Sequence, residues 1–364
     1  MNNNICIAKR ENNNKRNFII VNKKQGKHFP TSPTKALNIF DELYSKIENQ
    51  FNNEIILVIG FSETATAIGT RIAQKLNCKY IQTTREKKID NKYIYFSEEH
   101  SHASEQKLAF YDINNIYPKL NRIIFVEDEI TTGKTILNII DIIKKSFNNN
   151  DNIKFTAISI LNSMTNENLI KFKENNIDIK YIYKIDNKNY NEYLNKLCYN
   201  GKYIEKSNYD INYTELYFNF KLSPSHNIIE PFRYQKYCDE LYNYIYKNID
   251  LSNINTILIL GTEEFMYFPM ILAKKLEQNE KKVKFHATTR SPICVSNEKN
   301  YPLNTRFSLT SIYDDNRETY IYNLKKYDCV IIITDSNLIS KGTKNLISAL
   351  KSCDNENIYI IRCY

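Results

Sequence analysis

Short, continuous apolar segments recur along the chain and constrain its fold more than any other feature. They span residues 55–59, 123–126, 155–161, 256–260, 283–286, 329–333 and 358–361. Between them lie segments with apolar residues at helical spacing, such as 65–76 and 136–143. Continuously apolar strands are buried on both faces, and strands that alternate with helices form parallel sheets. The sequence therefore predicts an α/β protein built on parallel sheets.

Length bounds the number of domains. At roughly 150 residues per domain, a chain of 364 residues is expected to form two domains. Residues 187–229 are rich in Tyr and Asn and have weaker periodicity, so we place the boundary near residue 225. We predict two Rossmann-like parallel-sheet domains, 15–225 and 226–364.

Charge and apolar content exclude several other classes of protein. The formal net charge is +9, but basic residues never form a block, so we expect no nucleic-acid partner. No apolar run approaches the roughly 18 residues of a membrane span, and residues 1–14 lack the apolar stretch of a signal peptide. We therefore expect a cytoplasmic protein without membrane contact. The eight cysteines form no Cys-x-x-Cys pair and are expected to be reduced thiols.

The two halves of the chain share a weak repeat. Residues 55–60 and 256–261 are similar, and each is followed by a helical segment that ends in Ala-Gln-Lys-Leu or Ala-Lys-Lys-Leu. The next predicted strand then ends in Thr-Thr-Arg in both halves, at 83–85 and at 288–290. Chance similarity between apolar strands is the alternative explanation. The recurrence in order favours duplication with divergence, so we expect the second domain to be a diverged copy of the first.

Residues 122–140 carry the clearest chemical signal. A buried strand ends in Glu127 and Asp128, and a short loop then leads into a helix. Ligands of open α/β sheets bind beyond the strand carboxyl ends, and a helix amino terminus offers unpaired N–H groups to an anion. The acids suit the two vicinal hydroxyls of a ribose whose 5-phosphate lies in the loop. The loop donors that we expect are Thr131, Thr132, Gly133, Lys134 and Thr135.

A Walker A loop and an acidic helix cap are the two other interpretations of this segment. A Walker A loop requires a glycine five positions before Gly133, where this chain has Asp128. An acidic helix cap is the second alternative, because negative charge near a helix start is stabilising. A cap does not require both carboxylates and the Thr- and Gly-containing loop together, so we favour the phosphate site.

The segment 126–135 resembles the phosphoribosyl-diphosphate motif of type I phosphoribosyltransferases. Residues 26–28, 60–69, 83–86 and 98–103 further resemble the orotate-phosphoribosyltransferase-like proteins of bacterial tellurium-resistance and stress-response gene clusters. Residues 261–267, 289–292 and 320–323 resemble the TRSP domain that accompanies that family. The resemblance implies a type I phosphoribosyltransferase fold in the first domain. It also implies a role in making a ribosylated, nucleoside-like small molecule.

Carried over onto this chain, the resemblance assigns ligands of the diphosphate. The loop with Glu63 and Thr64 takes the position where backbone N–H groups hold the leaving group. A carboxylate beside a diphosphate implies Mg²⁺ between them, with Glu63 as the metal ligand, because Mg²⁺ prefers oxygen ligands. The alternative is that Glu63 caps the following helix. Arg85 and Lys27 are further candidate diphosphate ligands, with an ordinary exposed position as the alternative for each.

The cluster Glu98-Glu99-His100-Ser101-His102 lies where type I enzymes carry a loop that closes over the reaction centre. Two histidines at i and i+2 of an extended segment face one side and can handle protons or bind a metal. Without a nearby Cys or third His, we favour proton transfer by His100 and His102 over a zinc site. A solvated charged loop is the third interpretation.

A second polar set is expected in the C-terminal half. We predict that residues 261–267 and 288–291 come together at strand carboxyl ends. The set suits another substrate or a Mg²⁺-bound phosphate, and the alternative is a salt bridge between Arg290 and one glutamate that joins two loops. Its members are Glu263, Glu264, Thr289, Arg290 and Ser291.

Together these features predict an enzyme that uses 5-phosphoribosyl 1-diphosphate and Mg²⁺ to ribosylate a small, nucleobase-like acceptor. Glu127 and Asp128 would hold the ribose. A protein that only binds phosphoribosyl diphosphate or a nucleotide, and regulates a partner, is the alternative. A homodimer and contacts with other enzymes of the same gene cluster stay open as further partners.

Overall fold

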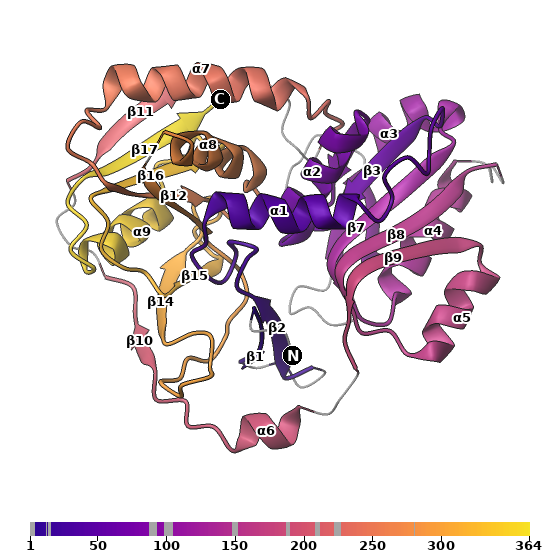
Figure 1. Ribbon diagram of the computed structural model, residues 1–364, viewed down its shortest axis with the longest axis horizontal. Helices are drawn as coiled ribbons and strands as arrows, with labels where there is room; N and C mark the ends of the chain where they lie inside the picture. Colours follow the sequence, from indigo (N-terminus) through magenta and orange to yellow (C-terminus); the bar gives the residue numbers. More distant parts are fainter. Residues whose placement is uncertain are drawn as a thin grey trace. The chain divides into compact units, whose positions relative to one another are not determined.

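The computed structural model describes residues 4–11, 13, 16–86, 93–97, 105–147, 152–186, 190–207, 212–221, 227–279 and 281–364. The chain divides into two compact units (Figure 1). We call Leu37–Lys188 with Leu222–Gln235 the middle unit. The terminal unit contains both ends of the chain and comprises Met1–Ala36, Asn189–Lys221 and Lys236–Tyr364. Helix α1 (Pro33–Tyr44) runs from the terminal unit into the middle unit.

The middle unit is built on a five-stranded sheet in which every neighbouring pair is parallel. Its strands, in spatial order, are β4 (Lys79–Gln82), β3 (Ile56–Gly60), β7 (Arg122–Ile130), β8 (Lys154–Asn162) and β9 (Ile177–Lys184). The helices between them are α2 (Ala65–Leu76), α3 (Phe110–Ile116), a short 3-10 helix (Tyr117–Lys119), α4 (Lys134–Ser146) and α5 (Asn166–Glu174). An antiparallel hairpin, β5 (Tyr93–Ser97) and β6 (Glu105–Ala109), lies between β4 and β7 in sequence.

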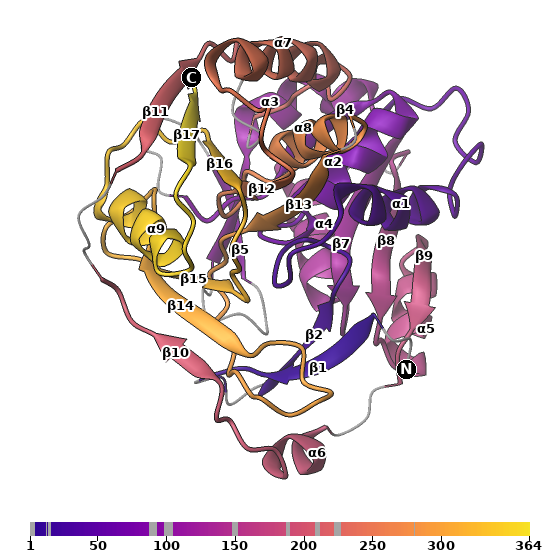
Figure 2. The same cartoon turned by 60° about the vertical axis from the view of Figure 1, so that its left-hand side comes forward.

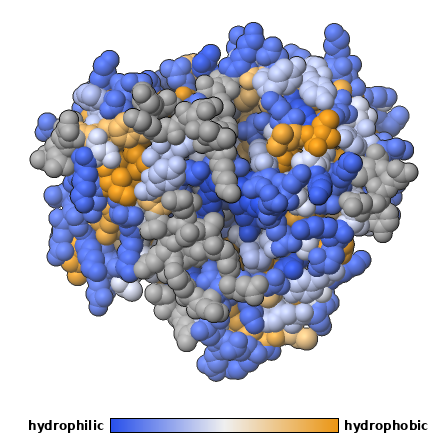
Figure 3. All heavy atoms as spheres, turned by 180° about the vertical axis from the view of Figure 1, so that it is seen from behind, coloured by the Kyte–Doolittle hydropathy of each residue, from blue (hydrophilic) through white to orange (hydrophobic). Residues whose placement is uncertain are grey.

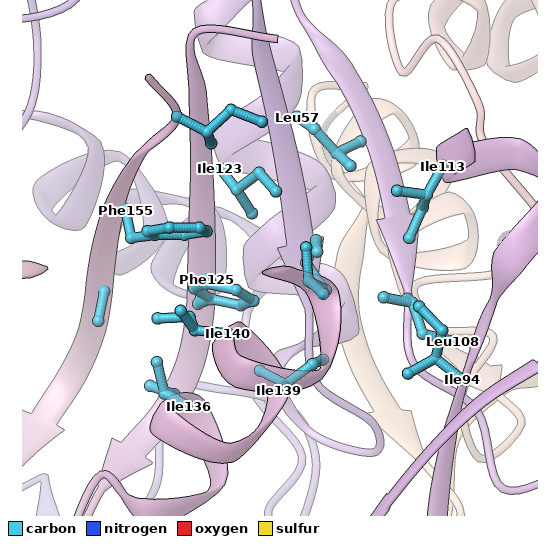
Figure 4. Close-up of a cluster of buried hydrophobic side chains, with 14 of the residues drawn as sticks. Leu57, Ile94, Leu108, Ile113, Ile123, Phe125, Ile136, Ile139, Ile140 and Phe155 are labelled. Carbon is cyan, nitrogen blue, oxygen red and sulfur yellow. The ribbon is translucent and has the colours of Figure 1, made fainter. Parts of the chain in front are cut away.

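The central strands of this sheet are buried on both faces. Side chains of one face, including Leu57 and Phe125, pack with α4, the hairpin and α3 in one hydrophobic core (Figure 4). On the opposite face Gly69 of α2 lies against Gly60 of β3 so closely that a Cβ at Gly69 would lie 3.0 Å from the Gly60 Cα. Because successive strand residues point to opposite faces, α4 and α2 cover the two sides of the sheet.

The terminal unit is built on a second five-stranded parallel sheet. Its strands, in spatial order, are β11 (Thr214–Phe218), β17 (Ile358–Cys363), β16 (Cys329–Thr334), β12 (Thr256–Gly261) and β13 (Lys282–Ala287). The helices of this unit are α6 (Asn191–Asn195), α8 (Tyr267–Glu277), α9 (Lys341–Lys351) and, from Lys236 onward, α7 (Arg233–Asn248). Figure 2 shows the C-terminal strand β17 between β11 and β16.

Two smaller sheets complete the terminal unit. Strand β14 (Thr305–Thr310) pairs antiparallel with β15 (Glu318–Tyr322) and parallel with β10 (Lys202–Ile204). The N-terminal strands β1 (Ile5–Lys9) and β2 (Phe18–Asn22) form an antiparallel pair. The apolar side chains of this pair share a core with Ile293 and Tyr322.

The two parallel sheets have the same order of connection. Strands β4-β3-β7-β8 of one correspond to β13-β12-β16-β17 of the other, with an antiparallel hairpin inserted before the third strand in sequence in both units. The fifth strand differs, because β9 follows the other four in sequence whereas β11 precedes them. The predicted fold class of two parallel-sheet α/β units is confirmed. The shared order supports the hypothesis of duplication.

The compact units differ from the predicted domains, 15–225 and 226–364. Residues before Leu37 belong to the terminal unit, because β1 and β2 pack on its core and Thr31 forms a backbone bridge with Phe285. A segment of the middle unit also lies beyond the predicted boundary, since Ile229 forms a bridge with Tyr80 at the sheet edge. Long-range strand pairing of this kind leaves no local signal in the sequence.

Figure 3 shows one face of the molecule, on which hydrophilic side chains predominate among the described residues and hydrophobic ones form small patches. No helix in the described ranges is long and apolar enough to span a membrane. All eight cysteines are free thiols, in agreement with the prediction.

Candidate active site

The candidate site lies at the carboxyl edge of the middle sheet, where β3 and β7 are neighbours. Strand β3 leads through α2 to β4 on one side, and β7 leads through α4 to β8 on the other. The loops after β3 and β7 therefore diverge from the point at which the strand order reverses. Ligands of open α/β sheets bind at this point.

Glu127 and Asp128 lie on β7 immediately beyond the last residue that pairs with β3. The register pairs Gly60 with Val126, so the two carboxylates extend past the end of β3. Val126 is fully buried, whereas Glu127 and Asp128 are partly exposed. The next strand supports the segment, because Glu127 is paired with Ser159 of β8. The sequence-predicted acids thus stand at the edge that can meet a ligand.

The predicted phosphate loop ends in the first turn of α4. Gly133 is the N-cap residue with φ +75°, and the backbone N–H groups of the first turn follow it. A Cβ at Gly133 would lie 2.3 Å from the Phe172 ring, so both the conformation and the space require glycine. Thr131, Thr132 and Thr135 are partly exposed and Lys134 is exposed. Threonine side chains of the loop are therefore partly exposed beside the two acids, and the N–H of Lys134 donates to Thr132 Oγ1 at 3.3 Å.

The loop after β3 is held by a network of buried polar groups. The N–H of Ser62 donates to Thr83 Oγ1 at 2.8 Å, and Gln106 Nε2 donates to the Ser62 carbonyl at 3.2 Å. The Thr83 hydroxyl donates to Gln106 Oε1. The sequence analysis did not identify Gln106. Residues two apart on a strand share a face, so a glutamine two positions before the apolar Leu108 was a signal that could have indicated a buried polar group. Gln106 is a positioning residue for this loop.

Glu63 and Thr64 follow in the same loop. The Glu63 side chain is 9% exposed, and α2 begins at Ala65 with Thr64 as the N-cap residue. Glu63 therefore lies one residue before the cap, and the Thr64 side chain makes no capping hydrogen bond. The peptide bond between Ser62 and Glu63 is cis.

Arg85 is the last residue of the Thr-Thr-Arg segment after β4. The segment is fixed by reciprocal backbone hydrogen bonds of 2.9 Å between Thr84 and Lys107 of the hairpin. The Arg85 side chain is partly exposed at the carboxyl edge of the sheet. Arg85 thus lies beside the loop that contains Glu63, since Thr83 bonds to Ser62.

Lys27 corrects a prediction. It belongs to the terminal unit and is fully buried, and its ammonium group donates to the carbonyls of Glu263 at 2.7 Å and Thr288 at 2.9 Å. A buried ammonium with two carbonyl acceptors joins loops and is not available to a diphosphate. The partners lie more than two hundred residues away in sequence, so no local pattern indicated this role.

Two predicted residues, His100 and His102, lie outside the described residues.

The polar set of the terminal unit does come together. The N–H of Glu263 donates to Thr288 Oγ1, and the N–H of Thr288 donates to the Gly261 carbonyl. This confirms that residues 261–267 and 288–291 meet at strand carboxyl ends. Arg290 forms ion pairs with Glu263 at 2.6 Å and with Glu264 at 3.2 Å. These are the contacts of the salt-bridge interpretation. Thr289 and Ser291 flank Arg290, and the N–H of Ser291 donates to Thr289 Oγ1.

Two family models match the sequence. Residues 5–186 match the family model PRTase_2, described as phosphoribosyl transferase, and residues 232–350 match the TRSP domain, described as C-terminal to PRTase_2. The first match covers half of the chain, which therefore belongs to the phosphoribosyl transferase family. The predicted family, its accompanying domain and the phosphoribosyltransferase class of enzyme are confirmed.

Solved structures of adenine phosphoribosyltransferases are similar to part of the chain. That from Leishmania tarentolae has 17% identity and a TM-score of 0.32, covering 41% of this chain and 71% of its own. That from Giardia lamblia, complexed with 9-deazaadenine, has 14% identity and a TM-score of 0.36, covering 50% and 93%. That from Leishmania donovani has 16% identity and a TM-score of 0.37, covering 50% and 76%. No curated protein matches the sequence.

Proposed function

We propose that the middle unit transfers the phosphoribosyl group of 5-phosphoribosyl 1-diphosphate to a small, nucleobase-like acceptor. The observation that carries this proposal is the position of Glu127 and Asp128, past the end of β3 and a few residues before the glycine-capped start of α4. Carboxylates and an anion-binding helix start at a strand-order reversal suit a ribose that carries a 5-phosphate. The family resemblance implies a nucleoside-like product.

Each part of the substrate has a partner in the proposed site. Glu127 and Asp128 accept hydrogen bonds from the two ribose hydroxyls. Thr131, Thr132 and Thr135 offer hydroxyls to the 5-phosphate, and the N–H groups at the start of α4 face the same anion. Arg85 and the backbone of the loop after β3 lie where the diphosphate would leave. The chemical acceleration then comes from positioning and charge stabilisation, because positive charge develops on the ribose and negative charge on the diphosphate.

The donor set of this edge fits Mg²⁺. Glu63 supplies a carboxylate, a hard oxygen ligand, and Mg²⁺ usually binds through one or two carboxylates together with substrate phosphates and water. No cluster of three or more metal-ligating side chains occurs within the described ranges. Glu63 would hold the ion together with the diphosphate. The bound ion would neutralise charge on the leaving group.

The test is release of diphosphate from phosphoribosyl diphosphate and Mg²⁺ with a panel of purine, pyrimidine and other nitrogen heterocycles. We expect acceptor-dependent release of diphosphate and a ribosylated product by mass spectrometry. Protein that carries both Glu127→Gln and Asp128→Asn, purified in parallel, controls for contaminating enzymes.

Calorimetric binding of phosphoribosyl diphosphate is measured on the same samples. Tight binding without turnover across the panel would contradict the enzyme and favour the sensor. Absence of binding would contradict both. Equal activity of the double variant would show that the measured turnover does not come from this edge.

A further inference from the structure

The carboxyl edge of the terminal sheet has the same frame as the candidate active site. Gly60 is paired with Val126 across β3 and β7, and Leu260 is paired with Ile332 across β12 and β16. Because Gly261 follows Leu260, Asp335 stands in the register position of Asp128. Helix α4 begins six residues after Asp128, and α9 begins six residues after Asp335. The position of a ribose-binding acid and the distance to the helix start are both retained.

The equivalent of the ribose position is occupied by a side chain of the same unit. The Tyr313 hydroxyl donates to Asp335 Oδ1 at 2.6 Å and lies 2.6 Å from the Thr262 hydroxyl. It thereby bridges the loops that follow β12 and β16. Burial, together with the charge of Asp335, raises the pKa of Tyr313 well above its ordinary value, so the hydroxyl remains a donor. A ribose hydroxyl would make the same bond to an aspartate.

The equivalent of the 5-phosphate position is also occupied. Asp315 Oδ1 accepts the N–H of Lys341, the first residue of α9, at 3.2 Å. Gly342 packs against the end of β14 so closely that a Cβ there would lie 2.2 Å from the Ser311 carbonyl oxygen. The Asp315 carboxylate and the backbone of Ser311 therefore occupy the space at the start of α9 in which an anion would bind.

A third carboxylate lies among the arginines that follow β13 and precede β15. Glu263 accepts from Arg290 Nε at 2.6 Å and from Arg317 Nη2 at 3.1 Å, and the Ser311 hydroxyl donates to its second oxygen. Its side chain is 2% exposed, and those of Arg290 and Arg317 are 9% and 19% exposed. Arg290 is the counterpart of Arg85 in the repeated Thr-Thr-Arg segment. The Glu263 carboxylate thus binds Arg290 at the position where Arg85 of the middle unit would bind the diphosphate.

We propose that Tyr313 and Asp315 of the loop after β14, together with Glu263, take the place of phosphoribosyl diphosphate at the edge of the terminal unit. The Tyr313 hydroxyl takes the position of a ribose hydroxyl, the Asp315 carboxylate that of the 5-phosphate and the Glu263 carboxylate that of the diphosphate. The chain then binds one phosphoribosyl diphosphate, at the middle unit, and Arg290 with Arg317 forms a diphosphate site that its own glutamate fills. The stoichiometry rests on the proposed function of the middle unit, whereas the filled arginine site does not.

The filled site is tested by emptying it. Glu263 has φ +46°, a conformation that glycine adopts without cost, so Glu263→Gly removes the carboxylate and suits the backbone. Glu263→Gly leaves Arg317 without this carboxylate and Arg290 with only Glu264, 3.2 Å away, so the excess positive charge of the two partly buried arginines favours uptake of an anion. We expect calorimetry with inorganic diphosphate to show one more site per chain than in wild type. At ten times the dissociation constant of that site, the melting temperature should rise by about 3 °C.

The matched control is Glu263→Gln, which removes the charge but keeps the space filled, and which should gain no site. Adding Arg290→Met to Glu263→Gly should abolish the gain. A folded Glu263→Gly protein without an additional diphosphate site would overturn the proposal. So would two phosphoribosyl-diphosphate sites in the wild-type chain, a measurement that needs no variant. Absence of any phosphoribosyl-diphosphate site in wild type would contradict the proposed function alone, because the inorganic-diphosphate experiment still decides the filled site.

Discussion

The two Thr-Thr-Arg segments make the same hydrogen bonds in both units. In the middle unit the N–H of Ser62 donates to Thr83 Oγ1, and in the terminal unit the N–H of Glu263 donates to Thr288 Oγ1. The second threonine of each segment forms reciprocal backbone bonds with the middle residue of the second hairpin strand. The shared frame therefore extends from strand order to individual hydrogen bonds.

The difference between the units lies in what stands at the edge of that frame. In the middle unit, partly exposed acids and threonines are accessible around the start of α4. In the terminal unit, Tyr313, Asp315 and Glu263 contact the corresponding positions from within the chain. The comparison teaches that a parallel-sheet frame is compatible with an open edge or a filled one, and that the loop side chains decide between them.

The largest effect is expected at Gly133, where the open edge depends on a positive φ. In Gly133→Ala the new Cβ meets the Phe172 ring at 2.3 Å, and φ +75° disfavours any side chain. We expect the free energy of unfolding of the middle unit to fall by about 3 kcal/mol. Urea unfolding followed by circular dichroism measures this. Thr135→Ala, two residues further along at a position without positive φ, is the control and should change stability little. Equal stability of Gly133→Ala and wild type would show that the loop relaxes freely.

The next prediction compares the effect on activity of substituting Asp128 and Asp335, which have the same register position in the two sheets. If Asp128 binds a ribose hydroxyl as we propose, Asp128→Asn removes the charge of that acceptor, which should cost about 1.5–3 kcal/mol, or about one to two decades in kcat/KM. Asp335→Asn should leave activity unchanged, because Tyr313 already occupies Asp335. Steady-state kinetics on both variants, with circular dichroism to confirm folding, provides the measurement. Loss of activity in Asp335→Asn alone would reverse the assignment of open and filled edges.

The strands and the loops at their carboxyl ends could be predicted because each of them has a local sequence pattern. Continuous apolar runs predicted seven of the strands of the two parallel sheets, and the acids at 127–128 before a glycine-containing loop were predicted at a strand end, where the structure places them. The repeated Thr-Thr-Arg also indicated which loops would meet, since carboxyl ends of parallel strands share one edge of a sheet.

Long-range contacts could not be predicted. Lys27 bonds to carbonyls of residues 263 and 288, and backbone acceptors carry no sequence signature. Tyr313 and Asp315 lie in a loop between two hairpin strands, and only the folded arrangement brings them to β16 and α9. Because the same residue types are ordinary in a surface loop, their role as occupants of the edge leaves no pattern to recognise.

A third effect concerns stability at acid pH. The two sheets differ here because one has a histidine where the other has an isoleucine at the same register position. His286 of β13 corresponds to Ile81 of β4, since they are paired with Leu260 and Ile59. Complete burial lowers the pKa of His286 to about 4. Protonation is thus less favourable in the folded state than in the unfolded chain. Neutral, buried His286 therefore contributes to the free energy of unfolding. This contribution is fully present above about pH 6.5 and is lost as the pH falls toward 4, so the free energy of unfolding should be lower by about 2 kcal/mol at pH 5.

The measurement is urea unfolding between pH 7 and pH 5. His286→Gln, which carries a polar group but no titrating one, should remove this part of the pH dependence. An identical pH dependence in wild type and His286→Gln would mean that other groups account for the acid sensitivity. The middle unit, with Ile81 at the matching position, lacks this contribution.

The smallest effect concerns how each helix begins at its edge. Helix α9 is capped by Ser340, whose hydroxyl accepts the N–H of Thr343 at 3.3 Å, whereas α4 is capped by Gly133 without a side-chain bond. Ser340→Ala should therefore lower the stability of the terminal unit by about 1 kcal/mol, and Ser340→Gly by less. Activity should not change, because Asp315 accepts an N–H at this helix start and our proposal assigns no substrate to it. Urea unfolding and the diphosphate-release assay on the same preparations measure both. A loss of turnover in a folded Ser340→Ala protein would mean that α9 contributes to the reaction, and the two edges would then be less different than their contacts indicate.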